Sequence, residues 1–303
     1  MRPILRPGTH VLRRSPTELQ VGLRQGQRLV LPDRPEVAAD LDRLAAADPP
    51  PASAVLDQLG EQGLLMEAST LLPLIPGGTS DRLGVSRADV AALARTAGNG
   101  VGALLEARAS HLVDVAPAGH PSAGALATRL ADLLDDVGLA VRARSHRARS
   151  HRARSRRRTE VAAMVVVGEP RRELVDGWMR EGVAHLLVRF TEGSATVGPF
   201  VVPGQTACLR CLDAHDTDVD PAFPLVVEQY ATASSRDRAD GVPEPVDQLL
   251  AALTLAWAAR DLATFVEGRR PSTWSSTVRL DRMLSPVQTR AWLRHAGCGC
   301  AWG

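Results

Sequence analysis

Cysteine is the residue type that points most clearly to chemistry in this chain of 303 residues. The four cysteines form two close pairs, a C-x-x-C at Cys208 and Cys211 and a C-x-C at Cys298 and Cys300. Two thiolates on such a turn can face one metal ion, and a second pair can complete the tetrahedron of a closed structural zinc site. The spacing therefore predicts one structural zinc ion, with no open position for catalysis. A redox or iron–sulfur pair, or two unrelated thiol pairs, are the alternatives that remain.

The composition is that of a globular protein, with 45% hydrophobic residues, 23% charged residues and a net charge of +2. All 36 basic residues are arginines, which excludes a Schiff-base lysine or a phosphate-binding Walker lysine. The first residues lack the apolar region of a signal peptide, and no run of eighteen apolar residues occurs. We therefore expect a cytoplasmic protein without a membrane partner.

Residues 142–158 form a basic segment with nine arginines and no acidic residue, and they repeat the pentapeptide ARSHR. The rest of the chain has 27 arginines against 34 acidic residues, which is not the balance of a dedicated nucleic-acid binder. The segment lacks any apolar residue larger than alanine, so we interpret it as a disordered surface insert. The alternative is an electrostatic tether for an acidic peptide, protein or nucleic acid.

The hydrophobic pattern predicts a small α+β domain over residues 1–72. Alternating apolar residues indicate strands at 9–14, 18–23 and 28–31, and helices are expected from Pro35 and after the N-cap Ser53. Residues 73–109 are expected to form a linker and a helix that glycines interrupt.

Residues 110–303 alternate between strand and helix patterns, which predicts a mostly parallel sheet flanked by helices. A long helix over 246–266 is expected to bury one face. The expected strands are 111–115, 139–142, 161–167, 185–190, 195–202 and 276–281; the shorter helices are 123–136 and 171–180; the buried face comprises Leu249, Leu250, Leu253 and Trp257.

The segment that follows the strand at 111–115 is where a nucleotide-binding loop would lie. It offers Ala118, Gly119 and Gly124, but Pro117 and Pro121 have no amide hydrogen for a phosphate. We interpret it as a degenerate nucleotide loop, and we predict no catalytic residue. The acidic residues at 213–220 are interpreted as a solvated loop, because the glycine that a calcium loop needs is absent there.

Two stretches resemble known families. Residues 197–212, VGPFVVPGQTACLRCL, together with Cys298-Gly-Cys, resemble the ThiF/MoeB-type superfamily, which is related to ubiquitin-activating enzymes. The opening MRPILRPGTH…LQVGL…LVLPD resembles the PqqD-like, winged-helix peptide clamps on ThiF-like proteins of ribosomal peptide clusters (azole, thiopeptide, bacteriocin). The resemblance implies a Rossmann-like ThiF-type domain with a zinc staple, preceded by a winged-helix-like α+β domain.

Active members of this superfamily adenylate a carboxyl terminus with a glycine-rich loop, an Asn-Leu-x-Arg-Gln stretch, a lysine and an aspartate. Here the stretch and the lysine are absent, and Glu169 stands at the aspartate position. The resemblance therefore implies a leader-peptide-binding scaffold that has lost adenylation and presents a precursor to a cyclodehydratase of the YcaO type. The alternative is an active ATP-dependent adenylyltransferase. A DNA-binding winged helix fits less well, since residues 37–44 contain a single arginine and no lysine.

The small N-terminal sheet offers the expected peptide site, because its edge strand can accept a further strand. We expect the leader peptide to pair with Arg28, Leu29, Val30 and Leu31 and to send apolar side chains into a cleft toward Val55 and Leu59. The alternative is that the ThiF-like domain covers this edge. The expected partners are thus the precursor peptide and the modifying enzyme, a homodimer is left open, and ATP is not expected as a cofactor.

Overall fold

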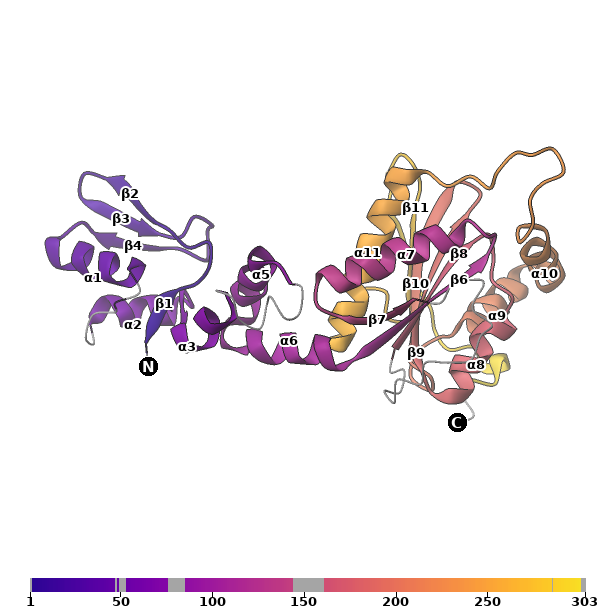
Figure 1. Cartoon of the computed structure of the whole chain (residues 1–303), viewed down its shortest axis with the longest axis horizontal. Coiled ribbons are helices and arrows are strands. Elements are labelled where there is room, and N and C mark those ends of the chain that lie inside the picture. The colour runs from indigo at the N-terminus through magenta and orange to yellow at the C-terminus, as the bar shows by residue number, and fades with distance from the viewer. Residues whose placement is uncertain are drawn as a thin grey trace. The chain divides into compact units, whose positions relative to one another are not determined.

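The computed structural model describes residues 2–46, 48, 53–75, 85–143, 161–284 and 286–300. The chain divides into two units, Met1–Glu106 and Ala107–Gly303 (Figure 1). All but the first two residues of the predicted basic insert, 142–158, lie outside the described residues. The linker predicted from residue 73 is likewise described only in part.

The first unit contains two small antiparallel sheets in its described part. Strands β2 (Val11–Ser15), β3 (Glu18–Val21) and β4 (Leu29–Pro32) form one sheet in that order and correspond to the three predicted strands. The second sheet, which the pattern did not predict, pairs β1 (Pro3–Leu5) with β5 (Leu65–Glu67). Each of these two strands has only three residues, which is too short to show an alternating pattern, and its partner lies about sixty residues away in the sequence.

Capping residues in the sequence explain where the helices of this unit begin. Helix α1 (Pro35–Ala45) starts with proline, and the hydroxyl of Ser53 accepts a hydrogen bond from the amide of Leu56 (3.4 Å) at the start of α2. Ser86 caps α5 in the same way. The remaining bounds are α2 (Ala54–Glu61), α3 (Ala68–Leu71), η1 (Leu72–Leu74), α5 (Arg87–Ala97) and η2 (Gly98–Gly100). Helix α6 (Val101–Ser110) begins in this unit, and its residues from Ala107 on belong to the second unit.

The described part of the second unit is built on a seven-stranded mixed sheet with the order β12-β11-β10-β9-β8-β6-β7. Strands β7, β6, β8 and β9 are parallel, as predicted, whereas β10, β11 and β12 are added antiparallel. The strands are β6 (Leu112–Gly119), β7 (Ala140–Ala143), β8 (Val161–Val167), β9 (Ala184–Thr191), β10 (Ser194–Val201), β11 (Ser276–Leu280) and β12 (Gln288–Ala291).

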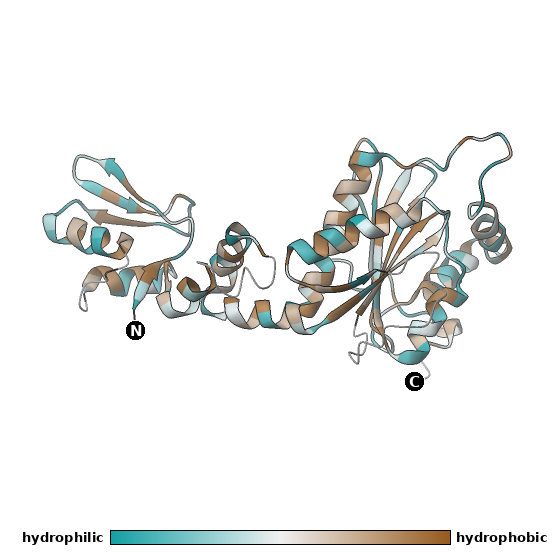
Figure 2. Cartoon of the chain, viewed as in Figure 1, coloured by the Kyte–Doolittle hydropathy of each residue, from teal (hydrophilic) through white to brown (hydrophobic). Residues whose placement is uncertain are grey.

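Helices cover both faces of the central parallel strands, whose apolar ribbons stand out in Figure 2. In β8, alternate residues point to opposite faces: Val161 and Ala163 contact the cluster under α7 and α11, and Ala162 and Met164 contact that under α8. Both faces are buried, which explains why β8 is continuously apolar. The helices are α7 (Ala123–Asp136), α8 (Glu173–Glu181), α9 (Leu209–Val219), α10 (Phe223–Ala233), α11 (Gln248–Val266) and η3 (Ala296–Cys298).

The predicted buried face of the long helix α11 is correct only in part, since Leu250 is buried and Trp257 is half-buried, but the other two residues are exposed. Leu249 is 84% exposed and Leu253 is 41% exposed, whereas Leu250, Leu255 and Leu262 are buried. The helix has apolar residues around most of its circumference, so periodicity alone does not select a face, and the sheet packs against its alanine-rich side. By length and composition α11 could cross a membrane, but more than half of its apolar window is buried in this core.

Two further expectations are corrected by tertiary contacts. Strand β6 continues to Gly119 instead of ending at Val115, and it includes Pro117. Among the described residues, β7 pairs only with the first half of β6, so none of them requires the missing amide of Pro117 on that side. The acidic stretch expected as a solvated loop lies instead largely in helix α9, and the carboxylate of Asp213 is paired with the buried guanidinium of Arg172.

A buried ion pair joins helix α6 to the end of α11. The guanidinium of Arg108, only 2% exposed, donates to the carboxylate of Glu267 and to the carbonyl oxygen of Val137 (2.9 Å). Burial acts to raise the pKa of Glu267, but the bonds from Arg269 and Arg108 outweigh it and hold the pKa below its ordinary value. The stability that this carboxylate supplies is therefore present above its ordinary pKa and is lost as the pH falls through the lower folded value.

Replacement Glu267→Gln should destabilise the second unit, because it leaves the buried charge of Arg108 without a counter-charge. We expect the free energy of unfolding at neutral pH to fall by about 3 kcal/mol, measured by urea denaturation followed by circular dichroism. The control is Glu181→Gln, an exposed position on α8. An equal effect of the two substitutions would contradict the assignment.

Candidate functional site

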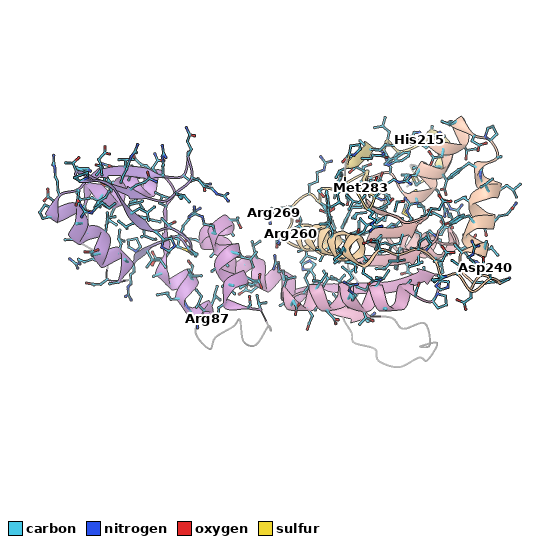
Figure 3. All side chains as sticks on the ribbon, turned by 90° about the horizontal axis from the view of Figure 1, so that it is seen from above. Arg87, His215, Asp240, Arg260, Arg269 and Met283 are labelled. Atoms are coloured by element: carbon cyan, nitrogen blue, oxygen red, sulfur yellow. The ribbon has the colours of Figure 1, made fainter. Side chains whose placement is uncertain are left out.

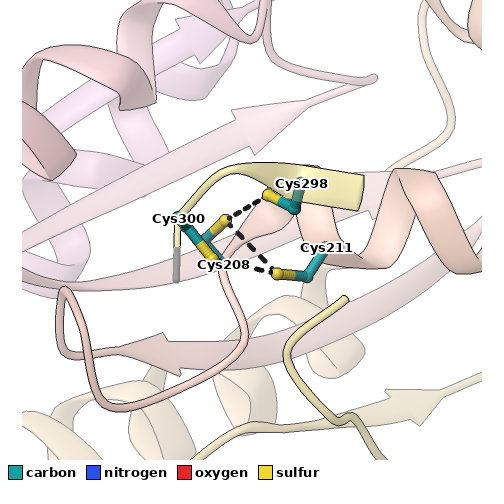
Figure 4. Close-up of side chains that lie close together, drawn as sticks. All are labelled: Cys208, Cys211, Cys298 and Cys300. Atoms are coloured by element: carbon teal, nitrogen blue, oxygen red, sulfur yellow. Dashed lines mark hydrogen bonds between the residues drawn. The ribbon is translucent and has the colours of Figure 1, made fainter. Parts of the chain in front are cut away.

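The four cysteines, far apart in sequence, form one group in the second unit (Figure 4). Cys208 caps α9 and Cys211 lies in its first turn, while Cys298 ends η3 and Cys300 follows it after one glycine. The Sγ atoms are separated by 3.5 Å (Cys208 to Cys298), 3.2 Å (Cys211 to Cys300) and 3.8 Å (Cys208 to Cys211). These distances are far longer than a disulfide bond of about 2.05 Å.

The separations suit a tetrahedral metal site. Four sulfur atoms bound to zinc at about 2.3 Å are about 3.8 Å apart along each edge of the tetrahedron, close to the observed values. The sequence therefore identified a group of residues that could hold a zinc ion, and every cysteine of the chain belongs to it. With four sulfur ligands the ion would have no position for a substrate, so its role would be structural.

Backbone conformation and hydrogen bonds position the four cysteines. Gly299 has a positive φ of 78°, which reverses the chain between the last two cysteines and favours glycine there. Cys211 lies at the positive end of the α9 dipole, and its sulfur accepts hydrogen bonds from the thiol of Cys208 and from the amide of His295 (3.3 Å). These bonds lower the pKa of Cys211, whereas the bond to Cys211 and burial raise the pKa of Cys208. Metal binding would displace the remaining thiol protons.

The segment that carries the second cysteine pair is anchored by the edge of the sheet. Trp292 follows β12, is 8% exposed, and donates its indole N–H to the hydroxyl of Thr277 (3.0 Å). The hydroxyl of Ser275 donates to the carbonyl oxygen of Trp292 (2.7 Å) and accepts from the amide of Ala207 (2.9 Å), next to Cys208. Neither β12 nor this link was predicted from the sequence.

A cavity of about 950 Å³ lies next to the sulfur group. Cys208, Cys298 and Cys300 form part of its wall, and Met179 and Leu209 contribute apolar surface. A chelator in solution would therefore have a path to a metal ion held by these cysteines.

The predicted nucleotide loop is placed at the carboxyl edge of the parallel strands. Ala118 and Gly119 are the last residues of β6, and Gly124 lies in the first turn of α7. Gly119 has a φ of +72°, and a Cβ atom there would lie 2.1 Å from the carbonyl oxygen of Val167. Close packing of two strands thus accounts for this glycine without a phosphate.

Part of the chain itself covers this edge. The imidazole of His120 contacts the carboxylate of Asp237 (3.0 Å), and Ser234 packs so closely on Gly168 that a Cβ there would lie 2.2 Å from the serine hydroxyl. The segment that follows α10 therefore lies over the ends of β6 and β8. In open α/β sheets this is the position where ligands bind.

Glu169, which stands where an aspartate was expected, is engaged by two arginines. Its carboxylate oxygens lie 2.9 Å from a guanidinium nitrogen of Arg172 and 2.9 Å from one of Arg189. Arg172 also forms a bidentate pair with Asp213 on α9 (2.7 and 2.9 Å). Burial opposes the charge of Arg172, but its bonds to Asp213 and Glu169 raise its pKa. Sequence reasoning named Glu169 but missed the arginines, because they become its partners only in the fold.

In the first unit, the residues predicted to bind peptide lie on and beneath the edge strand β4. Leu31 (4% exposed), Val55 (8%) and Leu59 (0%) pack in one core cluster, and half-buried Leu29 joins them. Val55 and Leu59 therefore support β4 from beneath and do not line an open groove. Arg28 is exposed just before the strand begins.

The outer side of β4 carries free backbone groups. The amide of Asp33 donates to the carbonyl oxygen of Thr17 (2.8 Å), in the register that pairs Leu19 with Leu31. Bonded and non-bonded pairs alternate along an antiparallel ladder, so Leu31 directs its backbone groups at β3 and Val30 directs its own outward. Within the described ranges no strand pairs with this side of β4.

The fold of this chain is similar to that of several solved structures. No protein-family model and no curated protein matches the sequence. The fold is similar to that of the heterocyclase TruD (TM-score 0.63, 17% identity), covering 99% of this chain and 42% of that one. It is also similar to E. coli MccB crystallised with MccA (TM-score 0.60, 12% identity, all of both chains) and with ATP (TM-score 0.54, 12% identity, 99% of this chain and 100% of that one).

This chain thus spans less than half the length of the heterocyclase. At these identities the likeness shows the fold alone.

Substitution Cys211→Ser should remove the metal and loosen the C-terminal segment. We expect purified wild-type protein to contain about one zinc per chain and the variant to contain little, with a lower melting temperature. Metal analysis and thermal unfolding measure both effects. A chelator should lower the melting temperature of the wild type and leave that of the variant unchanged. A metal-free wild type that melts at the same temperature as the zinc-loaded protein would contradict the prediction.

Proposed function

We propose that this protein binds the leader segment of a ribosomally made precursor peptide and presents it to a modifying enzyme. The fold shared with a heterocyclase and with a protein crystallised with MccA supports a role in the maturation of such peptides. The first unit would be the PqqD-like, winged-helix clamp, and the partner would be a YcaO-type cyclodehydratase in the cytoplasm. Zinc would staple the second unit without acting in chemistry.

The observation that carries the peptide-binding part is the open edge of β4. An incoming extended peptide can form main-chain hydrogen bonds with the outward amide and carbonyl of Val30 and thereby become a fourth strand. Leu29 and Leu31 face the core and keep this edge straight and supported from beneath. Arg28, exposed at the start of the strand, adds a charge that suits an acidic leader.

Substitution Val30→Pro should weaken peptide binding, because proline removes an outward amide within the predicted contact residues 28–31. We expect the dissociation constant for a labelled leader from the same gene cluster to rise about tenfold or more, measured by fluorescence polarisation with the full chain. Val30→Ala keeps the amide and should bind nearly as the wild type does.

A second proline variant controls for a general loss of structure. Arg13 lies on β2, the opposite edge of the same sheet, and its backbone groups also point outward by the same alternation. Arg13→Pro should leave binding largely intact. Equal losses in both proline variants, or unchanged binding in Val30→Pro, would show that the peptide does not pair with β4.

The contrasting function is adenylation, which the fold likeness to an ATP-bound MccB favours. We propose that this chain has lost it. A Mg²⁺–nucleotide complex needs carboxylate oxygens and an accessible strand edge. Here Glu169 is neutralised by Arg172 and Arg189, and Ser234 and Asp237 lie over the edge.

Calorimetry of the full chain with Mg²⁺ and ATP at physiological concentration should show no binding, and no ATP–pyrophosphate exchange should occur with the precursor present. E. coli MccB, whose complex with ATP is known, serves as the positive control. Micromolar ATP affinity or measurable exchange would favour the adenylyltransferase function.

A further inference from the structure

Two histidines and an aspartate lie beside the sulfur group and are used by none of the functions described above. We propose that His215, Asp218 and His295 form a second, solvent-accessible site for a divalent transition metal ion such as zinc. One ring nitrogen of each histidine and a carboxylate oxygen of Asp218 lie within 4.8 Å of one another. His215 projects from α9 at the periphery of the second unit (Figure 3).

The sulfur group itself organises this cluster. Cys211, His215 and Asp218 follow one another on α9 at spacings of four and three residues, so they lie on one face of the helix. The C-terminal segment runs alongside and contributes His295, three residues before Cys298. The amide of His295 donates to Cys211 Sγ (3.3 Å), so the cysteine group fixes the backbone that carries the third ligand.

The distances suit a shared ion. His295 Nε2 and Asp218 Oδ2 are 2.9 Å apart, and the two imidazole rings meet edge to face with centroids 4.8 Å apart. An ion bound at about 2.0–2.2 Å to a nitrogen and an oxygen ligand places those atoms about 3 Å apart when the bonds are near a right angle. The ion would therefore enter between His295 and Asp218 with little movement of either.

Hydrogen bonds fix the ring nitrogens that would bind. His215 Nε2 lies 3.0 Å from the carbonyl oxygen of Leu293, which requires its proton and leaves the lone pair on Nδ1. The amide of Gly297 donates to His295 Nδ1 (3.1 Å), so Nε2 carries the ring proton and faces Asp218. Metal binding at Nε2 would move that proton to Nδ1 and break the bond from Gly297. The bond from His215 to a backbone carbonyl orients its second ring nitrogen as is typical of metal-ligating histidines.

The donor set identifies the class of ion and the character of the site. Two imidazoles and a carboxylate suit zinc and its neighbours rather than calcium or magnesium, which prefer oxygen ligands. The side chain of Asp218 is 64% exposed, so water would complete the coordination. This second site would exchange its ion readily, in contrast to the closed four-sulfur site.

The test uses the full chain loaded with one zinc ion and titrates it with Zn²⁺ by calorimetry, and with Co²⁺ by absorption. We expect a second, weaker equivalent of metal, whose cobalt spectrum lacks the charge-transfer bands of thiolate ligands. His215→Ala and Asp218→Asn should each weaken this equivalent about tenfold or more and leave the first unchanged. Asp216→Asn, on the same helix and paired with Arg290, is the matched control and should bind as the wild type does.

Three results would overturn the proposal. The loaded wild type could bind no second equivalent, or the second equivalent could persist in the double variant His215→Ala/Asp218→Asn. Loss of the first equivalent in His215→Ala, with thiolate bands reduced, would show that this histidine belongs to the sulfur site. Circular dichroism of each variant confirms that the helix is retained.

Discussion

The four sulfur atoms lie where the C-terminal segment meets the start of α9, so their contact joins parts of the second unit that are far apart in sequence. The segment brings β12 to the sheet edge, buries Trp292, and places His295 beside α9. Four thiols alone would supply only weak hydrogen bonds, whereas an ion shared by four thiolates would bind the two segments with a strength that no local packing provides. An ion bound there would therefore stabilise this part of the fold, and the exposed histidine–aspartate cluster lies beside the same sulfur group.

The carboxyl edge of the parallel strands is organised by a second constraint, the balance of buried charge. Arg172 and Arg189 contribute two positive charges, and Glu169 and Asp213 supply two negative ones, so the group is neutral. Removing Glu169 or Asp213 would leave the buried guanidinium of Arg172 short of a counter-charge, at a cost in stability. A carboxylate that is paired in this way contributes to the stability of the fold. The same network ties α9, and with it the first cysteine pair, to the strand end.

In the described part of the first unit, a closed core lies beneath the sheet edge that β4 forms. Its largest apolar side chains are buried beneath β4, which leaves the backbone as the feature that a partner can recognise. A peptide that adds to such an edge gains its affinity from main-chain hydrogen bonds, and its side chains add specificity. The proposed binding of an extended leader would use this edge.

Local sequence determined several features, because capping, apolar runs and ligand spacing act over a few residues. Capping residues located the helix starts at Pro35 and Ser53, and the apolar pattern located the strand Val161–Val167 and the helix Ala123–Asp136. Ligand spacing predicted that the cysteines form one group. It did not reveal the partners of β1 and β5, the buried face of α11, or the helix formed by the acidic stretch at 213. Those features depend on contacts between residues far apart in the chain. Asp213 lies in a helix beside the guanidinium of Arg172, and Leu249 faces solvent. The positions of α8 and of the sheet determine both contacts. Only the tertiary structure could decide which charges meet and which apolar face is covered.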